Sequence, residues 1–140
     1  MRIVIDAQPI VEKRTGIGRY AFELIHALGK ITHKMEIIPF YFNFRGAFKD
    51  QSVWKEMSAI NPCEVKCIPG VIMHQLWRFC SLFPLTTFTG EADIYHFPNY
   101  LMKPCSKSGK VLLTLPDMSF IITLSPTDSF LLFEKSFPFL

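Results

Sequence analysis

The chain has 140 residues, a formal net charge of +3 and a charged fraction of 19%, while 49% of its residues are apolar. This length allows one domain at most, and the apolar content excludes a disordered chain, which needs low hydrophobicity and high net charge. The positive charge is too small for nucleic-acid binding, and no basic run is longer than Lys13-Arg14.

No segment has the sequence pattern of a membrane span or a signal peptide. The longest apolar stretches, such as 118–124, are far shorter than the about 18 residues that a span needs, and the first apolar run stops at Asp6. We therefore expect a cytoplasmic protein, at most peripheral to the inner face of the membrane, with reduced cysteines. Cys63 and Cys67 lack a second Cys/His pair, so we expect no metal site, and we expect no cofactor.

The beginning of the chain predicts a strand, a loop and a helix. Residues 2–6 form a nearly continuous apolar run, which is typical of a central parallel strand buried on both faces. A loop is expected over 7–15. From Ile17 to Leu28 apolar residues recur at helical spacing, which predicts an amphipathic helix with Thr15 as N-cap and Gly29 as its stop.

The rest of the chain continues the alternation of strands and helices. Residues 36–42 predict a strand, and Pro39 within it indicates an edge strand or a bulge. The remaining expected elements are strands at 65–68, 93–97 and 110–115, a helix at 71–83 and a weak helical pattern around Trp54. This alternation predicts an α/β fold, with a Rossmann-like parallel sheet flanked by helices. The last twenty residues, 121–140, show no clean period.

Two glycines, Gly16 and Gly18, stand at the start of the first expected helix. Helix N-termini favour phosphates, and glycines let a ligand approach the backbone closely. Together with Ala21 they match the alanine variant of the dinucleotide-binding fingerprint. However, nine residues separate them from the first strand, and the usual acidic residue after the second strand is missing. The alternative is that the glycines only pack the helix against the strand.

Polar residues follow two later strands. His96 and Asn99 come at the end of the strand at 93–97, and Asp117 follows the strand at 110–115. In open α/β sheets, ligands bind outside the carboxyl ends of the strands. A buried core histidine, an asparagine turn and an aspartate helix cap are the competing structural interpretations. The convergence of several strand ends on one edge favours a site.

The stretches 2–9, 16–20 and 93–100 together resemble the amino-terminal half of bacterial retaining glycosyltransferases of the GT-B fold, family 4 type. These enzymes are often mannosyl- or rhamnosyl-transferases of polysaccharide synthesis. The resemblance covers residues 1–120 and implies an acceptor-side domain, a nucleotide-sugar donor, a glycan or lipid-linked acceptor, and transfer without a metal ion. It implies a catalytic role for Asp117 and substrate binding by Gly16, Gly18, Arg19, His96 and Asn99.

The sequence departs from this family in two ways. Pro116 stands where the family usually has a histidine before the aspartate, and proline offers no polar side-chain atom. The donor-binding domain is absent from the 140 residues, and 121–140 match the family poorly. We therefore expect an incomplete GT-B half that is inactive by itself and could work with a separate donor domain, which leaves open whether the chain is an enzyme.

Two other functions remain open from the sequence. One is a small nucleotide-binding Rossmann domain. The other is a non-catalytic interaction domain that docks through an exposed apolar face. Residues 71–88, which include Arg78, fit core packing, the commoner case, or a membrane-facing apolar surface.

Overall fold

The computed structural model describes residues 1–12, 15–31, 35–48, 52–55, 57, 60–79, 83–99, 101–105 and 108–115. Within them, five strands form one parallel sheet in the order β3-β2-β1-β4-β5. The strands are β1 (Arg2–Asp6), β2 (Glu36–Phe42), β3 (Cys63–Val65), β4 (Ile94–Phe97) and β5 (Lys110–Leu113). The predicted α/β, Rossmann-like fold is confirmed, and the carboxyl ends of the strands meet at one edge of the sheet.

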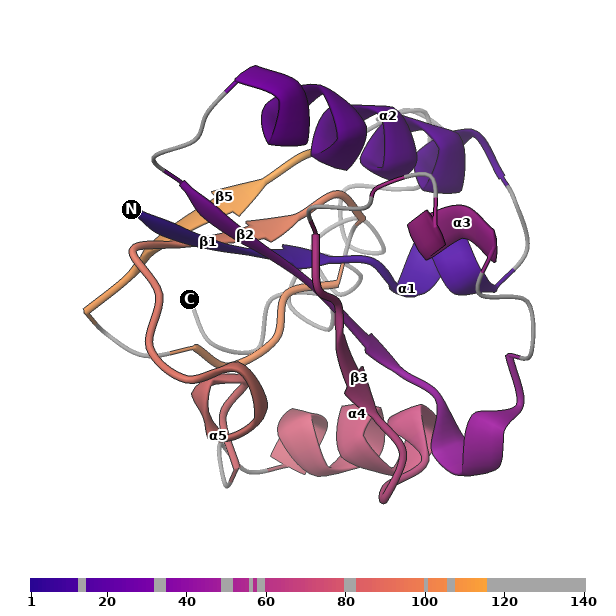
Figure 1. Ribbon diagram of the computed structural model, residues 1–140. Coiled ribbons are helices and arrows are strands. Elements are labelled where there is room, and N and C mark those ends of the chain that lie inside the picture. The colour runs from indigo at the N-terminus through magenta and orange to yellow at the C-terminus, as the bar shows by residue number, and fades with distance from the viewer. Residues whose placement is uncertain are drawn as a thin grey trace, which may run out of the picture.

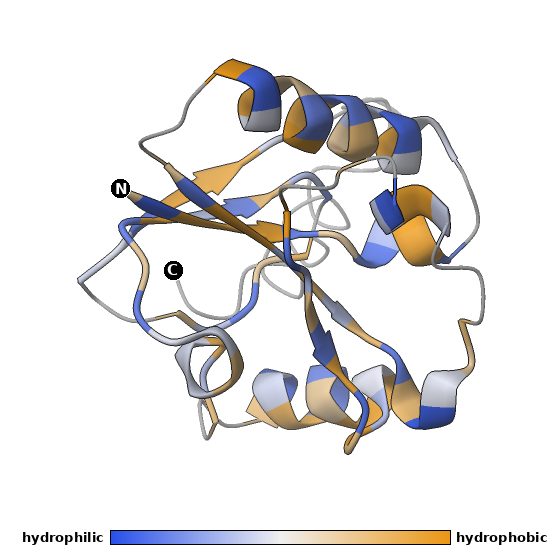
Figure 2. Cartoon of the chain, in the orientation of Figure 1, coloured by the Kyte–Doolittle hydropathy of each residue, from blue (hydrophilic) through white to orange (hydrophobic). Residues whose placement is uncertain are grey.

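Helices cover both faces of the sheet (Figure 1). One face carries α1 (Gln8–Val11), α2 (Gly16–Ile31) and α3 (Ser52–Lys55), and the other carries α4 (Gly70–Phe79) and α5 (Thr86–Thr89). A short 3-10 helix, η1 (Phe44–Gly46), follows β2. Ile3 and Ile5 of β1 pack toward the α2 face, whereas Val4 packs toward the α4 face. Apolar residues of β1 and β2 therefore lie at the centre of the molecule (Figure 2).

The expectation that Pro39 marks an edge strand or a bulge is wrong for β2 as a whole, because β2 lies between β1 and β3. Pro39 pairs with Ile5 of β1, but β3 begins its pairing only at Phe40. The carbonyl oxygen of Phe40 accepts a hydrogen bond from the Ala7 N–H on the β1 side. The backbone groups of successive strand residues point to opposite sides, so those of Pro39 point toward the β3 side. The missing N–H of Pro39 therefore falls where no described strand would accept it.

The loop expected at 7–15 contains the helix α1, which has Pro9 in its first turn, where a helix tolerates proline. Thr15 caps α2 as predicted, because its Oγ1 accepts a hydrogen bond from the Gly18 N–H at 3.4 Å. Gly29 does not end α2, which continues to Ile31. A Cβ at Gly29 would lie 2.9 Å from Ile60, so close packing explains this glycine.

The later elements differ from prediction mainly at their ends. β3 covers Cys63–Val65 instead of 65–68, and α5 was not expected at all. α4 begins at Gly70 and ends at Phe79, while residues 80–82 lie outside the described residues. Pro116, Asp117 and the predicted tail at 121–140 lie outside them too.

Candidate functional site

A cavity of about 350 Å³ opens at the carboxyl edge of the sheet, next to the end of β1 and the segment after β4. Its polar lining comes from the residues Asp6, Gln8, Glu12, Thr15, His74, Asn99 and Lys103. These residues come from β1, α1 and the residue after it, the residue before α2, α4 and the segment after β4, so only the fold brings them together. In open α/β sheets, ligands bind at this edge, outside the carboxyl ends of the strands.

The most buried part of the cavity wall is an ion pair between Asp6 and Lys103. The two residues are 4% and 2% exposed, and the Lys103 ammonium contacts the Asp6 carboxylate. The ammonium also lies 5.7 Å from the ring centre of Phe40 and 5.9 Å from that of Phe97. Lysine is almost never fully buried unless it is paired, so the contact with Asp6 explains why Lys103 can be buried at this edge. No sequence pattern points to Lys103, which lies far from Asp6 along the chain.

Gln8 holds the same edge together from the first turn of α1. Its Oε1 accepts the Phe42 N–H at 2.8 Å, and its Nε2 donates to Glu12 Oε1 at 2.8 Å. The side chain thereby continues the pairing of β1 with β2 beyond the strand ends. It also places the Glu12 carboxylate beside the cavity.

His74 contributes a neutral imidazole to the cavity. Burial lowers the pKa of His74 and the charge of Lys103 lowers it further, while the charge of Asp6 acts in the opposite direction. The ring packs edge-on against Trp77 at 5.7 Å and Phe42 at 6.3 Å between ring centres. A neutral imidazole can donate one hydrogen bond and accept another, without adding charge.

His96 of β4 is 4% exposed and does not line this cavity. Its Nε2 lies 2.9 Å from Thr114 Oγ1, which in turn lies 3.5 Å from the hydroxyl of Tyr20 on α2. Burial lowers the pKa of His96, and the nearby charge of Asp6 partly opposes that effect. These surroundings are those of a hydrogen-bonded core histidine, so its role in substrate binding stays a prediction.

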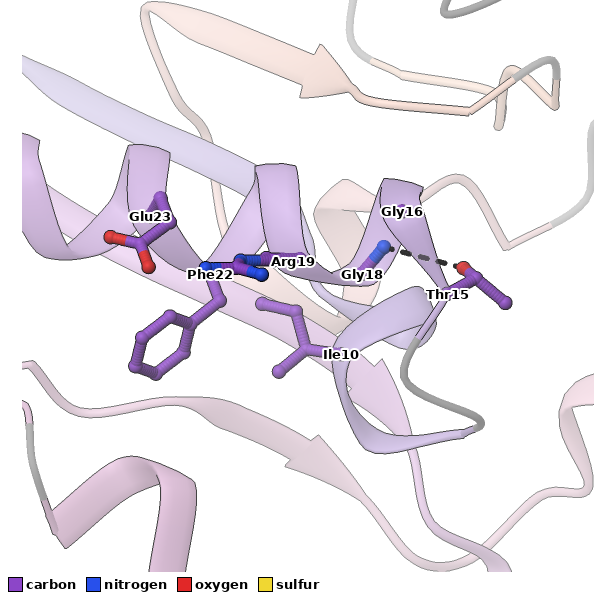
Figure 3. Close-up of a pocket in the computed structure, with 7 residues that line it drawn as sticks. All are labelled: Ile10, Thr15, Gly16, Gly18, Arg19, Phe22 and Glu23. Atoms are coloured by element: carbon purple, nitrogen blue, oxygen red, sulfur yellow. Dashed lines mark hydrogen bonds between the residues drawn. The ribbon is translucent and has the colours of Figure 1, made fainter.

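The predicted glycines line a second cavity, of about 600 Å³, on the side of α2 that faces α1 (Figure 3). Its lining residues are Ile10, Thr15, Gly16, Gly18, Arg19, Phe22 and Glu23. The two glycines differ sharply. A Cβ at Gly18 would lie 2.3 Å from the Pro9 carbonyl oxygen, whereas a Cβ at Gly16 would meet no atom within 4 Å. Gly18 therefore allows α2 to pack on α1, rather than on the strand.

The structure thus separates the predicted site residues. Asn99 lines the cavity at the carboxyl edge, and Gly16, Gly18 and Arg19 line the second cavity. His96 is buried and lies within hydrogen-bonding distance of Thr114, which follows β5, and Asp117 lies outside the described residues. Among the described lining residues, Thr15 alone belongs to both cavities.

In the described part of the chain, no three or more His, Cys, Asp or Glu side chains are close enough together to hold a metal ion. None of the helices described has the length and apolar character that crossing a bilayer requires. No protein-family model, no curated protein and no solved structure matches the chain. The structure itself defines the class, a Rossmann-like α/β domain with a polar cavity at the carboxyl edge of its sheet.

Proposed function

We propose that this domain is the acceptor side of a retaining glycosyltransferase in polysaccharide or glycan synthesis. The observation that carries the proposal is the polar cavity at the carboxyl edge, where Asp6, Lys103 and Asn99 offer both acceptors and donors. Each hydroxyl of a sugar both donates and accepts hydrogen bonds, so a mixed lining matches it. The resemblance of 2–9, 16–20 and 93–100 to the glycosyltransferase family supports the same function.

In this proposal the cavity holds a glycan or lipid-linked acceptor, and a second domain holds the nucleotide-sugar donor. Transfer requires both reactants in near-attack geometry, so the domain alone binds an acceptor and does not turn over. Because nucleotide-sugars supply the donor, we place the reaction in the cytoplasm, at most peripherally at the inner face of the membrane.

The geometry around Gly18 disfavours the alternative of a dinucleotide-binding domain. In that motif the second glycine lets the backbone approach the pyrophosphate. Here the Pro9 carbonyl oxygen occupies the space beside Gly18, and a carbonyl oxygen repels a phosphate oxygen. The helix α1 also separates β1 from the start of α2, where the motif would need a direct turn.

A binding experiment tests the proposed function. We would titrate the isotope-labelled chain with a panel of mannose- and rhamnose-containing oligosaccharides, and separately with NAD, and follow backbone amide shifts by NMR. We expect an oligosaccharide to shift the amides of Gln8, His74 and Asn99. The Asn99→Ala variant should weaken binding, whereas Asn61→Ala removes an exposed amide elsewhere and should not. Binding of NAD, or of no oligosaccharide, would contradict the proposal.

A further inference from the structure

The ion pair at the wall of the carboxyl-edge cavity has hydrogen-bonding capacity that its own contacts do not use. Among the described residues, Lys103 Nζ donates to Asp6 and otherwise faces the rings of Phe40 and Phe97. An ammonium has three N–H donors and each carboxylate oxygen has two lone pairs. Asp6 Oδ1 accepts the Gln8 N–H at 3.2 Å, which leaves further lone pairs on the carboxylate. Both residues line the cavity, and the side chains of Lys103 and Asp6 are 1% and 5% exposed, so only a group that enters the most buried part of the cavity reaches this unused capacity.

The charges around the cavity select against an anionic ligand. Among the described residues that line the cavity, the carboxylates of Asp6 and Glu12 face one ammonium, that of Lys103, and the other polar groups carry no charge near neutral pH. The start of α2 lies at the same cavity, and Thr15 there accepts from one of the N–H groups of the first turn, that of Gly18. Among these described residues a phosphate would therefore meet more negative than positive charge, and like charges in a site of low dielectric repel strongly.

The size of the cavity limits the ligand as well. Its volume of about 350 Å³ lies at the small end of the range of roughly 300–1,000 Å³ that is usual for ligand pockets. That volume suits one sugar ring better than a long chain. The apolar part of the lining, which includes Pro9, Ile17 and Leu101, provides a surface for the carbon face of such a ring.

We infer that this cavity binds a single neutral, unphosphorylated sugar residue, whose hydroxyls bond to the Asp6–Lys103 pair. The carboxylate of Asp6 accepts from one hydroxyl, and the ammonium of Lys103 donates to a neighbouring one. Glu12, held by Gln8, excludes phosphorylated sugars from the same place. This inference rests on the proposed function and names the chemical class of the acceptor residue that enters the domain.

The test compares a neutral with a phosphorylated sugar. We would titrate the labelled chain with methyl α-mannopyranoside, methyl α-rhamnopyranoside, mannose 6-phosphate and inorganic phosphate, each over the same millimolar range, and follow amide shifts by NMR. We expect a neutral glycoside to shift the amides of Gln8, His74 and Lys103, and mannose 6-phosphate to bind at least tenfold more weakly. The Glu12→Gln variant should reduce that discrimination severalfold, because it removes the negative charge that repels the phosphate.

A double variant tests the ion pair without leaving a buried charge. Asp6→Leu combined with Lys103→Met replaces both groups by apolar side chains, which proteins often tolerate without loss of stability. We expect a loss of glycoside binding of tenfold or more. The control Lys66→Met removes a largely exposed lysine that pairs with Glu64 on β3, and it should bind as the wild type does. A circular dichroism melt establishes that each variant is folded. If the double variant does not fold, the Glu12→Gln comparison decides.

Three results would overturn the inference. The first is tighter binding of mannose 6-phosphate or inorganic phosphate at these amides. The second is a glycoside that shifts only residues of the cavity beside Arg19, and the third is the absence of binding by any monosaccharide. The proposed function would survive each of them if the oligosaccharide panel still shifts the carboxyl-edge cavity, so the two failures are distinguishable.

Discussion

The contrast between Gly18 and Gly16 gives the sharpest test of the packing described here. In the Gly18→Ala variant the new methyl group would lie 2.3 Å from the Pro9 carbonyl oxygen, whereas an ordinary carbon–oxygen contact is about 3.3–3.6 Å. The helices α1 and α2 must therefore separate by roughly 1 Å. In the Gly16→Ala variant the methyl group meets no atom within 4 Å.

The expected magnitudes follow from these two distances. Overpacking of a close contact costs about 1–3 kcal/mol, and the better helix propensity of alanine returns up to about 1 kcal/mol. We therefore expect Gly18→Ala to lower the free energy of unfolding by about 1–2 kcal/mol. Gly16→Ala should be neutral or raise it by about 0.4–1 kcal/mol, because it restricts the unfolded chain without strain.

Urea unfolding, followed by tryptophan fluorescence, measures both variants. Trp54 and Trp77 are 8% and 2% exposed, so unfolding changes the surroundings of both rings. The midpoint should shift at constant slope, since the variants change stability and not the area exposed. Equal midpoints for Gly16→Ala and Gly18→Ala would refute the explanation that Gly18 serves the contact with Pro9.

Three further predictions concern buried charge, pH and the exposed face of α4. Lys103→Met leaves the Asp6 carboxylate buried without its partner, so the free energy of unfolding, measured in urea, should fall by about 3–5 kcal/mol. An unchanged free energy of unfolding would contradict the presence of a buried ion pair. Burial lowers the pKa of His96 below its unfolded value of about 6.5, so stability should be full above that pH and decline as pH falls through it. In urea midpoints measured across pH, His96→Gln should make the loss of stability at low pH smaller. An equally large effect of the control His26→Gln would show that the pKa of His96 is not the cause. Phe79 is 84% exposed, so Phe79→Ser should change the free energy of unfolding by less than about 0.5 kcal/mol and reduce self-association measured by light scattering. An unchanged scattering signal would show that this face of α4 takes no part in self-association.

The sequence alone determined the first two strands of the sheet. The strands Arg2–Asp6 and Glu36–Phe42 have the predicted bounds, because the middle of a central parallel strand is buried on both faces and therefore carries a run of apolar residues. The helix α2 begins where Thr15 and the spacing of its apolar residues place it. These features depend on neighbours in the sequence, so local pattern suffices for them.

Tertiary structure decided what the local pattern left open. Pro39 is compatible with an internal strand only because β3 begins beyond it, and Gly18 is a packing residue only because α1 lies against α2. No local pattern marks Lys103 as functional. Because β4 pairs with β1, the segment after β4 brings Lys103 into contact with Asp6 at the carboxyl edge. Contacts between residues far apart in the chain depend on strand order, which no spacing along the sequence encodes, and the cavity is made of such contacts.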